Sequence, residues 1–457
     1  MATDVSRPVE VPAKPSRQGS LLRVLGVGFG LAVIIGNTIG AGILRTPGVV
    51  ASRLPVTWLF LGVWVAGGLY ALLGSFAVSE LSAMLPRAGG YYVFARRALG
   101  EYGSFVVGWT DWMSQVGTTA AVTLVIAEYL DPFLGRLANH HVIVASGVAL
   151  LFGFLQWRGI RWGCIVQNLT TTAKTVAFLA FVGAAFLLPH STHTHTAAPM
   201  MAAGAGIAAW VIALQAVIYS YDGWYGVMYF SEEVKNPDKD VPRSMIGGVI
   251  SLMVIYLLVS LALLHVLSVQ GIAGENMPMG AAMQAMFGPR GDTIIRLVMI
   301  VSMMSGINAY HLIATRIPFA MAKDGMFFHW ATHVNPGGTP SVSLWISVLA
   351  SVLFISGGKF FERVAAILAF FFVADYAMAY AAVFILRRRE PETRRPYRAW
   401  GYPWTTGIAL AGSIAFLIAA IASDTENSLW AVGVLAISYP LYLVMRMVMK
   451  RTQPVAG

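Results

Sequence analysis

Long apolar runs separated by short polar connections dominate the chain. A run of about 20 apolar residues is long enough to cross the hydrocarbon core of a bilayer as an α-helix. The pattern predicts twelve spans, which begin near Val24, Trp58, Gly103, Val142, Ile165, Gly206, Ser244, Ile294, Ser341, Arg363, Pro403 and Ser428. A shorter apolar stretch, Met279–Phe287, precedes the eighth span and is a candidate separate helix. We therefore expect an all-α polytopic membrane protein without a soluble domain.

Two of the runs are interrupted in the middle by sequence that does not favour a helix. The first run, Val24–Leu44, is broken at the glycine-rich segment Gly36–Gly42, and the sixth, Gly206–Phe230, is broken at Tyr219–Trp224. Lipid cannot satisfy unwound backbone, which persists at bilayer depth only where it lines a cavity or is buried in protein. Paired breaks in two halves are the sequence signal for the substrate site of a secondary transporter. The pattern indicates a carrier for a small zwitterion or cation.

The spacing of the breaks predicts an internal repeat. Spans one to five and six to ten form two units, and because five is odd the second unit is inverted relative to the first. We expect this transport core over residues 19–390, and two peripheral helices over 391–448. Residues 1–18, rich in proline and charge, read as a disordered cytoplasmic tail, and 449–457 as a second cytoplasmic tail.

Composition supports the membrane assignment. The chain is 57% hydrophobic and 11% charged, whereas soluble proteins carry about 25% charged residues. The net charge of +10 lies mostly in the tails and even-numbered loops, which places both termini in the cytoplasm by the positive-inside rule. We expect contact with the bilayer, including anionic lipids at the cytoplasmic face, and no nucleic acid. The polar first residues do not resemble a cleavable signal peptide.

Metal and redox chemistry find little support. The single cysteine, Cys164, cannot form an intramolecular disulfide. His190, His193 and His195 share a predicted outer loop without carboxylates, which is more typical of a polar loop than of a metal site. We expect no cofactor and no metal.

The first break supplies groups that suit a carboxylate. Gly40, Ala41 and Gly42 leave the backbone uncovered, and a second half-helix is expected to start near Ile43. The first N–H groups of a helix lack intrahelical partners and carry the positive end of its dipole, so they bind anions. Close helix packing is the alternative explanation for the glycines.

Carbonyls at both breaks suit an ammonium group. Those near Ile35 and Gly36 end the first half-helix, and those of Tyr219 and Ser220 lie at the second break. The predicted substrate-binding residues are Ile35, Thr38, Ile39, Gly40, Ala41, Gly42, Tyr219, Ser220, Asp222 and Gly223, with Asn37 as a secondary candidate. Tyr219 and Trp224 flank the second break, where a bulky aromatic side chain could occlude the site.

Three charged residues lie deep within predicted spans. Asp222 could attract a substrate ammonium or cationic side chain, carry a coupling proton, or cap the second half of its span. Asp375 in the tenth span could pair with a polar partner or face the pathway. Lys174 in the fifth span could carry a proton, because burial favours a neutral amine. It could also brace carbonyls of the first break where a sodium ion would otherwise sit, or snorkel to the membrane surface.

Four motifs in order resemble the amino acid–polyamine–organocation superfamily, specifically its bacterial permeases near the L-type amino-acid transporters. The resemblance runs from about Leu21 to Arg398. The motifs are Gly36–Ile43, Glu80–Tyr92, Ser231–Asp238 followed by Val241–Ser244, and Arg395–Arg398 with Gly401–Pro403.

The resemblance implies twelve helices around a five-plus-five inverted-repeat, LeuT-like core with broken helices 1 and 6 and alternating access. It implies a carboxylate site at Ile39–Gly42, an ammonium site near Tyr219–Asp222 and an outer gate at Tyr219. Lys174 stands where sodium-coupled relatives bind sodium, which implies sodium-independent transport. Asp222 departs from the Gly, Ser or Ala of many relatives. No cysteine lies in an outer loop, so no disulfide-linked glycoprotein partner is expected.

These observations predict a sodium-independent amino-acid carrier of the bacterial inner membrane that works by exchange or proton-coupled uptake. A cationic amino acid or polyamine antiporter is the alternative. A channel is disfavoured because no repeated filter loop is present, and a membrane enzyme because the spans contain no cluster of His, Cys and carboxylates.

Overall fold

The computed structural model describes residues 21–137, 139–188, 206–357, 361–423 and 425–452. Within these ranges every regular element is a helix, and β contacts are confined to two isolated bridges, Leu25 with Val234 and Val334 with Pro340. The prediction of an all-α protein is confirmed for this part of the chain. The predicted tail 1–18 and the outer-loop histidines lie outside the described residues, as does the end of the C-terminal tail.

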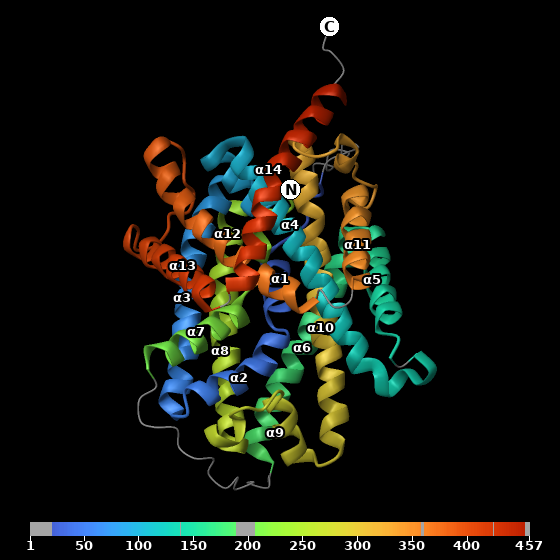
Figure 1. Ribbon diagram of the computed structural model, residues 1–457, viewed down its shortest axis with the longest axis vertical. Coiled ribbons are helices and arrows are strands. Elements are labelled where there is room, and N and C mark those ends of the chain that lie inside the picture. The colour runs from blue at the N-terminus through green and yellow to red at the C-terminus, as the bar shows by residue number, and fades with distance from the viewer. Residues whose placement is uncertain (1–20, 138, 189–205, 358–360, 424, 453–457) are drawn as a thin grey trace, which may run out of the picture.

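The helices of the first half lie at the centre of the molecule and on both sides of it, with α3 at the left and α5 at the right in Figure 1. They are α1 (Val27–Thr38), α2 (Ala41–Arg53), α3 (Thr57–Met84), α4 (Tyr91–Leu134), the 3-10 helix η1 (Gly135–Leu137), α5 (His141–Trp157) and α6 (Ile160–Leu187).

The helices of the second half interleave with those of the first. They are α7 (Ile207–Tyr221), the 3-10 helix η2 (Gly226–Phe230), α8 (Pro237–Ile272), α9 (Pro278–Phe287), α10 (Arg290–Lys323), the 3-10 helix η3 (His329–Thr332), α11 (Ser341–Ser356) and α12 (Phe361–Arg389). The apolar stretch Met279–Phe287 thus forms its own helix, α9. Helix α1 packs on α6, α8 and α10, so segments far apart in sequence enclose the first break.

Two final helices, α13 (Trp404–Ser423) and α14 (Thr425–Thr452), lie outside this arrangement. Helix α13 packs on α3 and α12, whereas α14 crosses α4 and α12 (Figure 1). Helix α14 continues through residue 452, past the predicted start of the C-terminal tail at residue 449.

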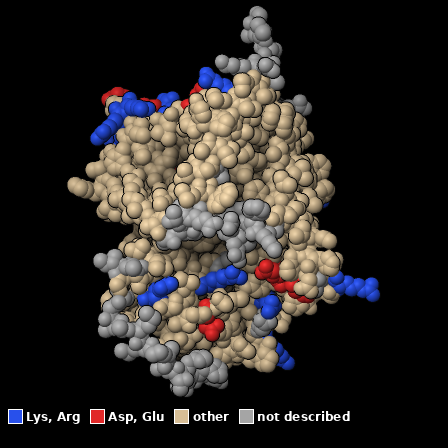
Figure 2. Space-filling view, viewed as in Figure 1, with Lys and Arg blue, Asp and Glu red and all other residues tan. Residues whose placement is uncertain are grey.

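The helices have the length and composition of membrane spans. In the described residues seven helices are long and apolar enough to cross a bilayer, or nine if each of two bent pairs is one span. One bent pair, Val27–Thr38 with Gly42–Arg53, turns by 49°. Figure 2 shows Lys, Arg, Asp and Glu at the upper end and in a lower band, with a mostly uncharged surface between them. The protein is a multi-pass membrane protein.

Small residues allow the central helices to pack closely. On α3, a Cβ at Gly67 would lie 2.5 Å from Val217 of α7, and one at Gly68 would lie 2.5 Å from Met253 of α8. Membrane helices use such positions because lipid tails supply no hydrophobic drive for association, and close van der Waals packing replaces it. This packing holds the elements that carry the second break against the centre of the molecule.

Candidate functional site

The first break consists of two residues. Helix α1 ends at Thr38, Ile39 and Gly40 have non-helical backbone, and α2 begins at Ala41. The second half-helix therefore starts two residues before the predicted Ile43, because the 49° bend needs only a short non-helical link. Gly40 is the N-cap of α2 and supplies no side-chain hydrogen bond, so no cap competes for the first N–H groups of that helix.

The second break depends on a glycine. Helix α7 ends at Tyr221, Asp222 is extended, and Gly223 has φ +105°, a conformation that side chains other than glycine rarely adopt. The chain then enters η2, which carries no side-chain cap. Asp222 therefore does not cap the second half of this span, which was one of its three predicted roles.

The two breaks contact each other directly. The Asn37 side chain donates a hydrogen bond to the Gly223 carbonyl at 3.2 Å. The Tyr256 hydroxyl on α8 lies 3.1 Å from the Thr38 carbonyl and 2.8 Å from the Ser220 carbonyl, one from each break. These bonds satisfy backbone groups that lipid could not, and they fix the spacing between the breaks.

At Gly42, α2 approaches α7 closely. A Cβ added there would lie 2.9 Å from the Ser220 Cα atom, so a larger residue would push the backbones apart. The Ser220 hydroxyl donates to the Thr46 hydroxyl at 2.7 Å in the next turn of α2. The absence of a side chain at Gly42 therefore lets α2 pack against α7, and it also leaves the backbone at the start of α2 uncovered.

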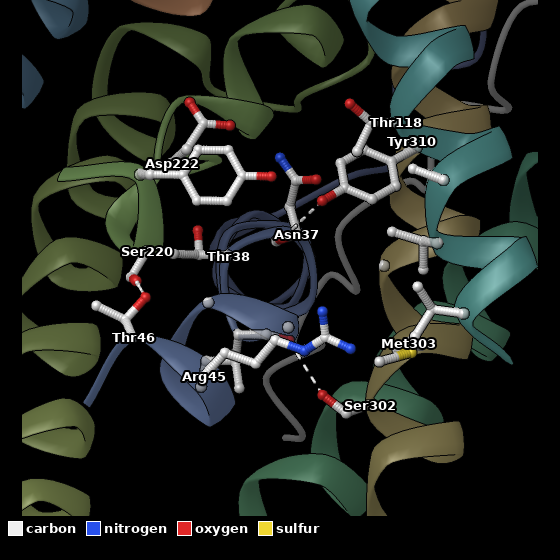
Figure 3. A pocket seen from close by; sticks show the side chains of 18 of the residues that line it. Asn37, Thr38, Arg45, Thr46, Thr118, Ser220, Asp222, Ser302, Met303 and Tyr310 are labelled. Carbon is white, nitrogen blue, oxygen red and sulfur yellow. Dashed lines mark hydrogen bonds between the residues drawn. The ribbon is translucent and has the colours of Figure 1, made fainter. Parts of the chain in front are cut away.

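A cavity of about 300 Å³ opens where the breaks meet (Figure 3). The predicted residues that line it are Asn37, Thr38, Ile39, Gly40, Gly42, Tyr219, Ser220 and Asp222. Its volume is at the lower end of the range for small-molecule sites. Apolar wall is contributed by α4 and by Met303 and Phe372, while Tyr310 and Ser302 add hydroxyls.

The other predicted residues lie around the cavity rather than on its wall. Ile35 is partly buried in α1, Gly223 packs under Asn37, and the backbone of Ala41 forms the start of α2. Tyr219 is 49% exposed and lines the cavity, whereas Trp224 is 1% exposed. Trp224 packs in a layer behind the wall, with ring centroids 5.6 Å from Tyr376 and 5.7 Å from Tyr225.

Lys174 lies behind the first break, fully buried. Its ammonium donates to the Gly36 carbonyl at 2.9 Å and also to the Ile39 carbonyl. The Ser302 hydroxyl on α10 donates to the same Ile39 carbonyl at 3.1 Å. Of the three roles predicted for Lys174, this geometry corresponds to the carbonyl brace, and the buried ammonium does not snorkel.

Lys174 shares α6 with several polar side chains. The Thr170 hydroxyl donates to the Val166 carbonyl of the same helix. Gln167 and Thr171 instead face α1, and each donates to the Ala32 carbonyl, at 3.1 and 3.0 Å. A run of polar residues at positions 167, 171 and 174 shares one helical face, which is the signal that could have identified Gln167.

Asp222 faces the cavity and is held by tyrosines. Its carboxylate accepts hydrogen bonds from the hydroxyls of Tyr376 and Tyr225, the latter at 3.4 Å. Both oxygens are therefore oriented while one face of the group remains on the cavity wall. The carboxylate is positioned to meet a positively charged group in the cavity.

Two further buried carboxylates lie behind Asp222. Asp111 on α4 accepts from the Tyr229 hydroxyl at 2.8 and 2.9 Å and from Gln115 at 3.2 Å. Asp375 on α12 is 3% exposed, and its Oδ2 atom has no hydrogen-bond partner among the described residues. The sequence analysis missed Asp111, although an acid within an apolar span is itself a functional signal.

The motifs outside the breaks contribute ion pairs to the framework. Glu80 binds Arg387 at 2.6 Å and Arg395 at 3.3 Å, so α3 anchors the segment after α12. Glu233 pairs with Arg316 through two bonds of 2.9 and 3.0 Å, and neither side chain is exposed. Arg387 and Arg395 therefore hold the end of α12 and the segment after it against α3, in addition to the positive charge that they give to a predicted cytoplasmic loop.

The comparison with known proteins identifies the class. The family model described as amino acid permease matches residues 29–445, so the chain belongs to the amino acid permease family. It is 29% identical over 439 residues to the serine/threonine exchanger SteT of Bacillus subtilis (strain 168), covering 94% of this chain and 98% of that protein.

Two more relatives extend the comparison. The branched-chain amino acid permease BcaP of Bacillus subtilis (strain 168) is 26% identical over 426 residues, 87% of this chain and 88% of that protein. The b(0,+)-type amino acid transporter 1 of Homo sapiens is 23% identical over 403 residues, 85% of this chain and 81% of that protein. The expected superfamily and the expected function, amino acid transport, are confirmed.

Proposed function

We propose that this protein is a sodium-independent amino-acid carrier of the bacterial inner membrane that works by alternating access, through exchange or proton-coupled uptake. The observation that carries the proposal is the cavity at the two breaks, where the uncapped first turn of α2 faces Tyr219, Ser220 and Asp222. Both termini are proposed to be cytoplasmic, from the distribution of Lys and Arg.

The substrate carboxylate is proposed to bind the backbone N–H groups that follow Gly40. These groups lack intrahelical acceptors and lie at the positive end of the α2 dipole, so no basic side chain is required. The substrate ammonium would lie toward the carbonyls of Ile35 and Tyr219 and the carboxylate of Asp222. Tyr219, half exposed in the cavity, is proposed as the gate. Trp224 would contribute to the gate only through the aromatic layer that it forms with Tyr376 and Tyr225 behind the cavity wall.

Sodium independence rests on the place of Lys174. Two carbonyls and a hydroxyl converge near its ammonium, from Gly36, Ile39 and Ser302. Oxygen atoms of this kind are the ligands that a small hard cation would use. The Lys174 ammonium donates hydrogen bonds at the position that such a cation would occupy. Because Lys174 does not line the cavity, it would act on the substrate through the backbone of the first break.

The architecture is proposed to be a five-plus-five inverted repeat with twelve spans. The broken pairs α1–α2 and α7–η2 would open the two units, each followed by four helices, with α9 as an addition to the second unit. Helices α13 and α14 would be peripheral, which agrees with a core over residues 19–390. Support comes from the equivalent position of the breaks and their meeting at one cavity.

A cationic amino acid or polyamine antiporter is the second candidate. Asp222 on the cavity wall favours it, because a carboxylate there would pair with a second positive group on the substrate. Arg45 also lines the cavity, and its positive charge opposes a cationic substrate.

Reconstitution in liposomes tests the proposal. Uptake of a labelled amino-acid panel is measured into empty and amino-acid-loaded vesicles, with and without sodium and with an inward proton gradient. Uptake only into loaded vesicles would establish exchange, and uptake into empty vesicles that rises with the proton gradient would establish symport. A requirement for sodium, or no uptake of any amino acid, would contradict the proposal.

A further inference from the structure

Arg45 lies between the central cavity and a second hollow. That hollow, of about 510 Å³, is bordered by Gly48 and Ser52 of α2 and by Glu275 and Met277 before α9. Among the described residues, Arg45 is the one that lines both the hollow and the central cavity. The side chain is exposed, and Figure 3 shows it extending along the cavity from the first turns of α2.

Tyr129 on α4 lies beside Arg45, although it lines neither hollow. The Tyr129 hydroxyl interacts with the Arg45 guanidinium and contacts the Met277 sulfur at 2.9 Å. The guanidinium of Arg296 lies 5.8 Å from the centre of the Tyr129 ring. We call the region beside Arg45 and Tyr129, where the two hollows adjoin, the neck. Because the N-terminus is proposed to be cytoplasmic, α2 leads from the first break toward the outside, so the neck lies on the outward side of the cavity.

The charges on the cavity wall are asymmetric. Within the described part of the chain, Arg45 and Asp222 are the charged residues that line the cavity. Figure 3 shows them on opposite sides of it, with Arg45 below the first break and Asp222 above. A molecule that moves from the outer hollow, which Glu275 borders, into the cavity thus passes Arg45 before it reaches Asp222.

We propose that Arg45 is a charge filter at the outer neck, which draws in the carboxylate of zwitterionic amino acids and disfavours cationic amino acids and polyamines. This inference rests on the proposed function and narrows its substrate class to neutral amino acids. A fixed charge in a narrow passage raises the local concentration of molecules with the opposite charge and opposes molecules with the same charge. Asp222 then orients the ammonium of a zwitterion that has already passed.

Transport selectivity gives the first test. Wild type, Arg45→Gln and Arg45→Lys are reconstituted, and inhibition of labelled serine uptake by external lysine is measured. We expect Arg45→Gln to improve the inhibition constant of lysine relative to the KM of serine by about ten-fold, the size of effect that one nearby charge produces. Arg45→Lys should remain close to wild type. Arg53→Gln, an exposed arginine on α2 that lines neither hollow, should change nothing.

A second test does not need a transported substrate. Thr118 lines the cavity, and a Thr118→Cys, Cys164→Ser protein in intact cells is treated with membrane-impermeant cationic and anionic methanethiosulfonate reagents. We expect Arg45→Gln to raise the ratio of cationic to anionic reaction rates by about ten-fold, and Arg45→Lys and Arg53→Gln to leave the ratio unchanged.

The outcomes separate the two proposals. An unchanged rate ratio in Arg45→Gln, equal shifts in Arg45→Gln and Arg45→Lys, or no reaction at the introduced thiol would overturn the charge filter. A shifted rate ratio without uptake of any amino acid would support the filter and contradict the proposed function.

Discussion

The Lys174 ammonium donates a hydrogen bond to the Gly36 carbonyl at 2.9 Å, although 138 residues separate the two. The bond ties α6 to the last turn of α1, where the backbone carbonyls no longer have N–H donors within the helix. A second bond from the same ammonium reaches the Ile39 carbonyl in the break itself. One buried side chain therefore compensates for two backbone groups that the break releases.

Replacement of Lys174 by alanine should abolish transport or its dependence on pH. The substitution leaves the Gly36 and Ile39 carbonyls without that donor, and each unsatisfied buried group costs about 1–3 kcal/mol. Initial uptake rates in proteoliposomes across a pH series measure the effect. Thr170→Val on the same helix is the control, because the Thr170 hydroxyl bonds only within α6. Unchanged kinetics in Lys174→Ala would exclude both proton transfer and bracing.

Valine at Gly42 should abolish substrate binding. The added Cβ would lie 2.9 Å from the Ser220 Cα atom, so the side chain would separate α2 from α7 and cover the N–H groups at the start of α2. Binding is measured as the shift in melting temperature of the purified protein on addition of amino acids. Gly62→Ala on α3 is the control, since nothing lies within 4 Å of a Cβ at that position and Gly62 does not line the cavity. Binding retained by Gly42→Val would mean that the carboxylate site lies elsewhere.

Asparagine at Asp222 should weaken cationic competitors more than neutral ones, by about ten-fold, the effect of removing one nearby charge. The amide keeps the shape of the carboxylate but removes the charge that faces the cavity. Competition against a labelled neutral substrate measures the ratio. Asp238→Asn, at the half-exposed start of α8, is a control for general charge effects. Equal losses for both substrate types would instead indicate that Asp222 contacts only the ammonium that both types carry, or that it acts by holding Tyr376 and Tyr225.

Methionine at Arg316 should destabilise the folded protein by about 3–5 kcal/mol, because it leaves Glu233 charged and buried without a partner. Thermal unfolding in detergent measures the loss. The pair Lys323–Glu232 provides the comparison: its side chains are 38% and 24% exposed, so Lys323→Met should cost no more than about 1 kcal/mol. Adding Glu233→Gln to Arg316→Met should recover part of the stability. A small loss in Arg316→Met would show that the buried pair contributes little.

Much of the site followed from local sequence. Gly40 lies in the first break and Gly223 in the second, whereas Gly36 and Gly42 lie inside α1 and α2. Because glycine disfavours a helix, these residues indicated where the breaks lie but not their exact bounds. Eight of the predicted residues then line one cavity. Asp111, Gln167 and Tyr376 were not predicted as part of the site, because each lies on a span without a break. Arg45 was not predicted because it follows the end of the first apolar run at Leu44.

By itself the sequence determined that the chain is helical, crosses a membrane and interrupts two of its helices, because hydrophobic length and glycine content act along the chain. Tertiary structure alone decided that Lys174 reaches Gly36, that Asp222 is held by Tyr376 rather than capping a helix, and that Arg45 borders two hollows. Those relationships depend on how helices distant in sequence pack, and apolar periodicity gives the buried face of a helix but not its neighbour.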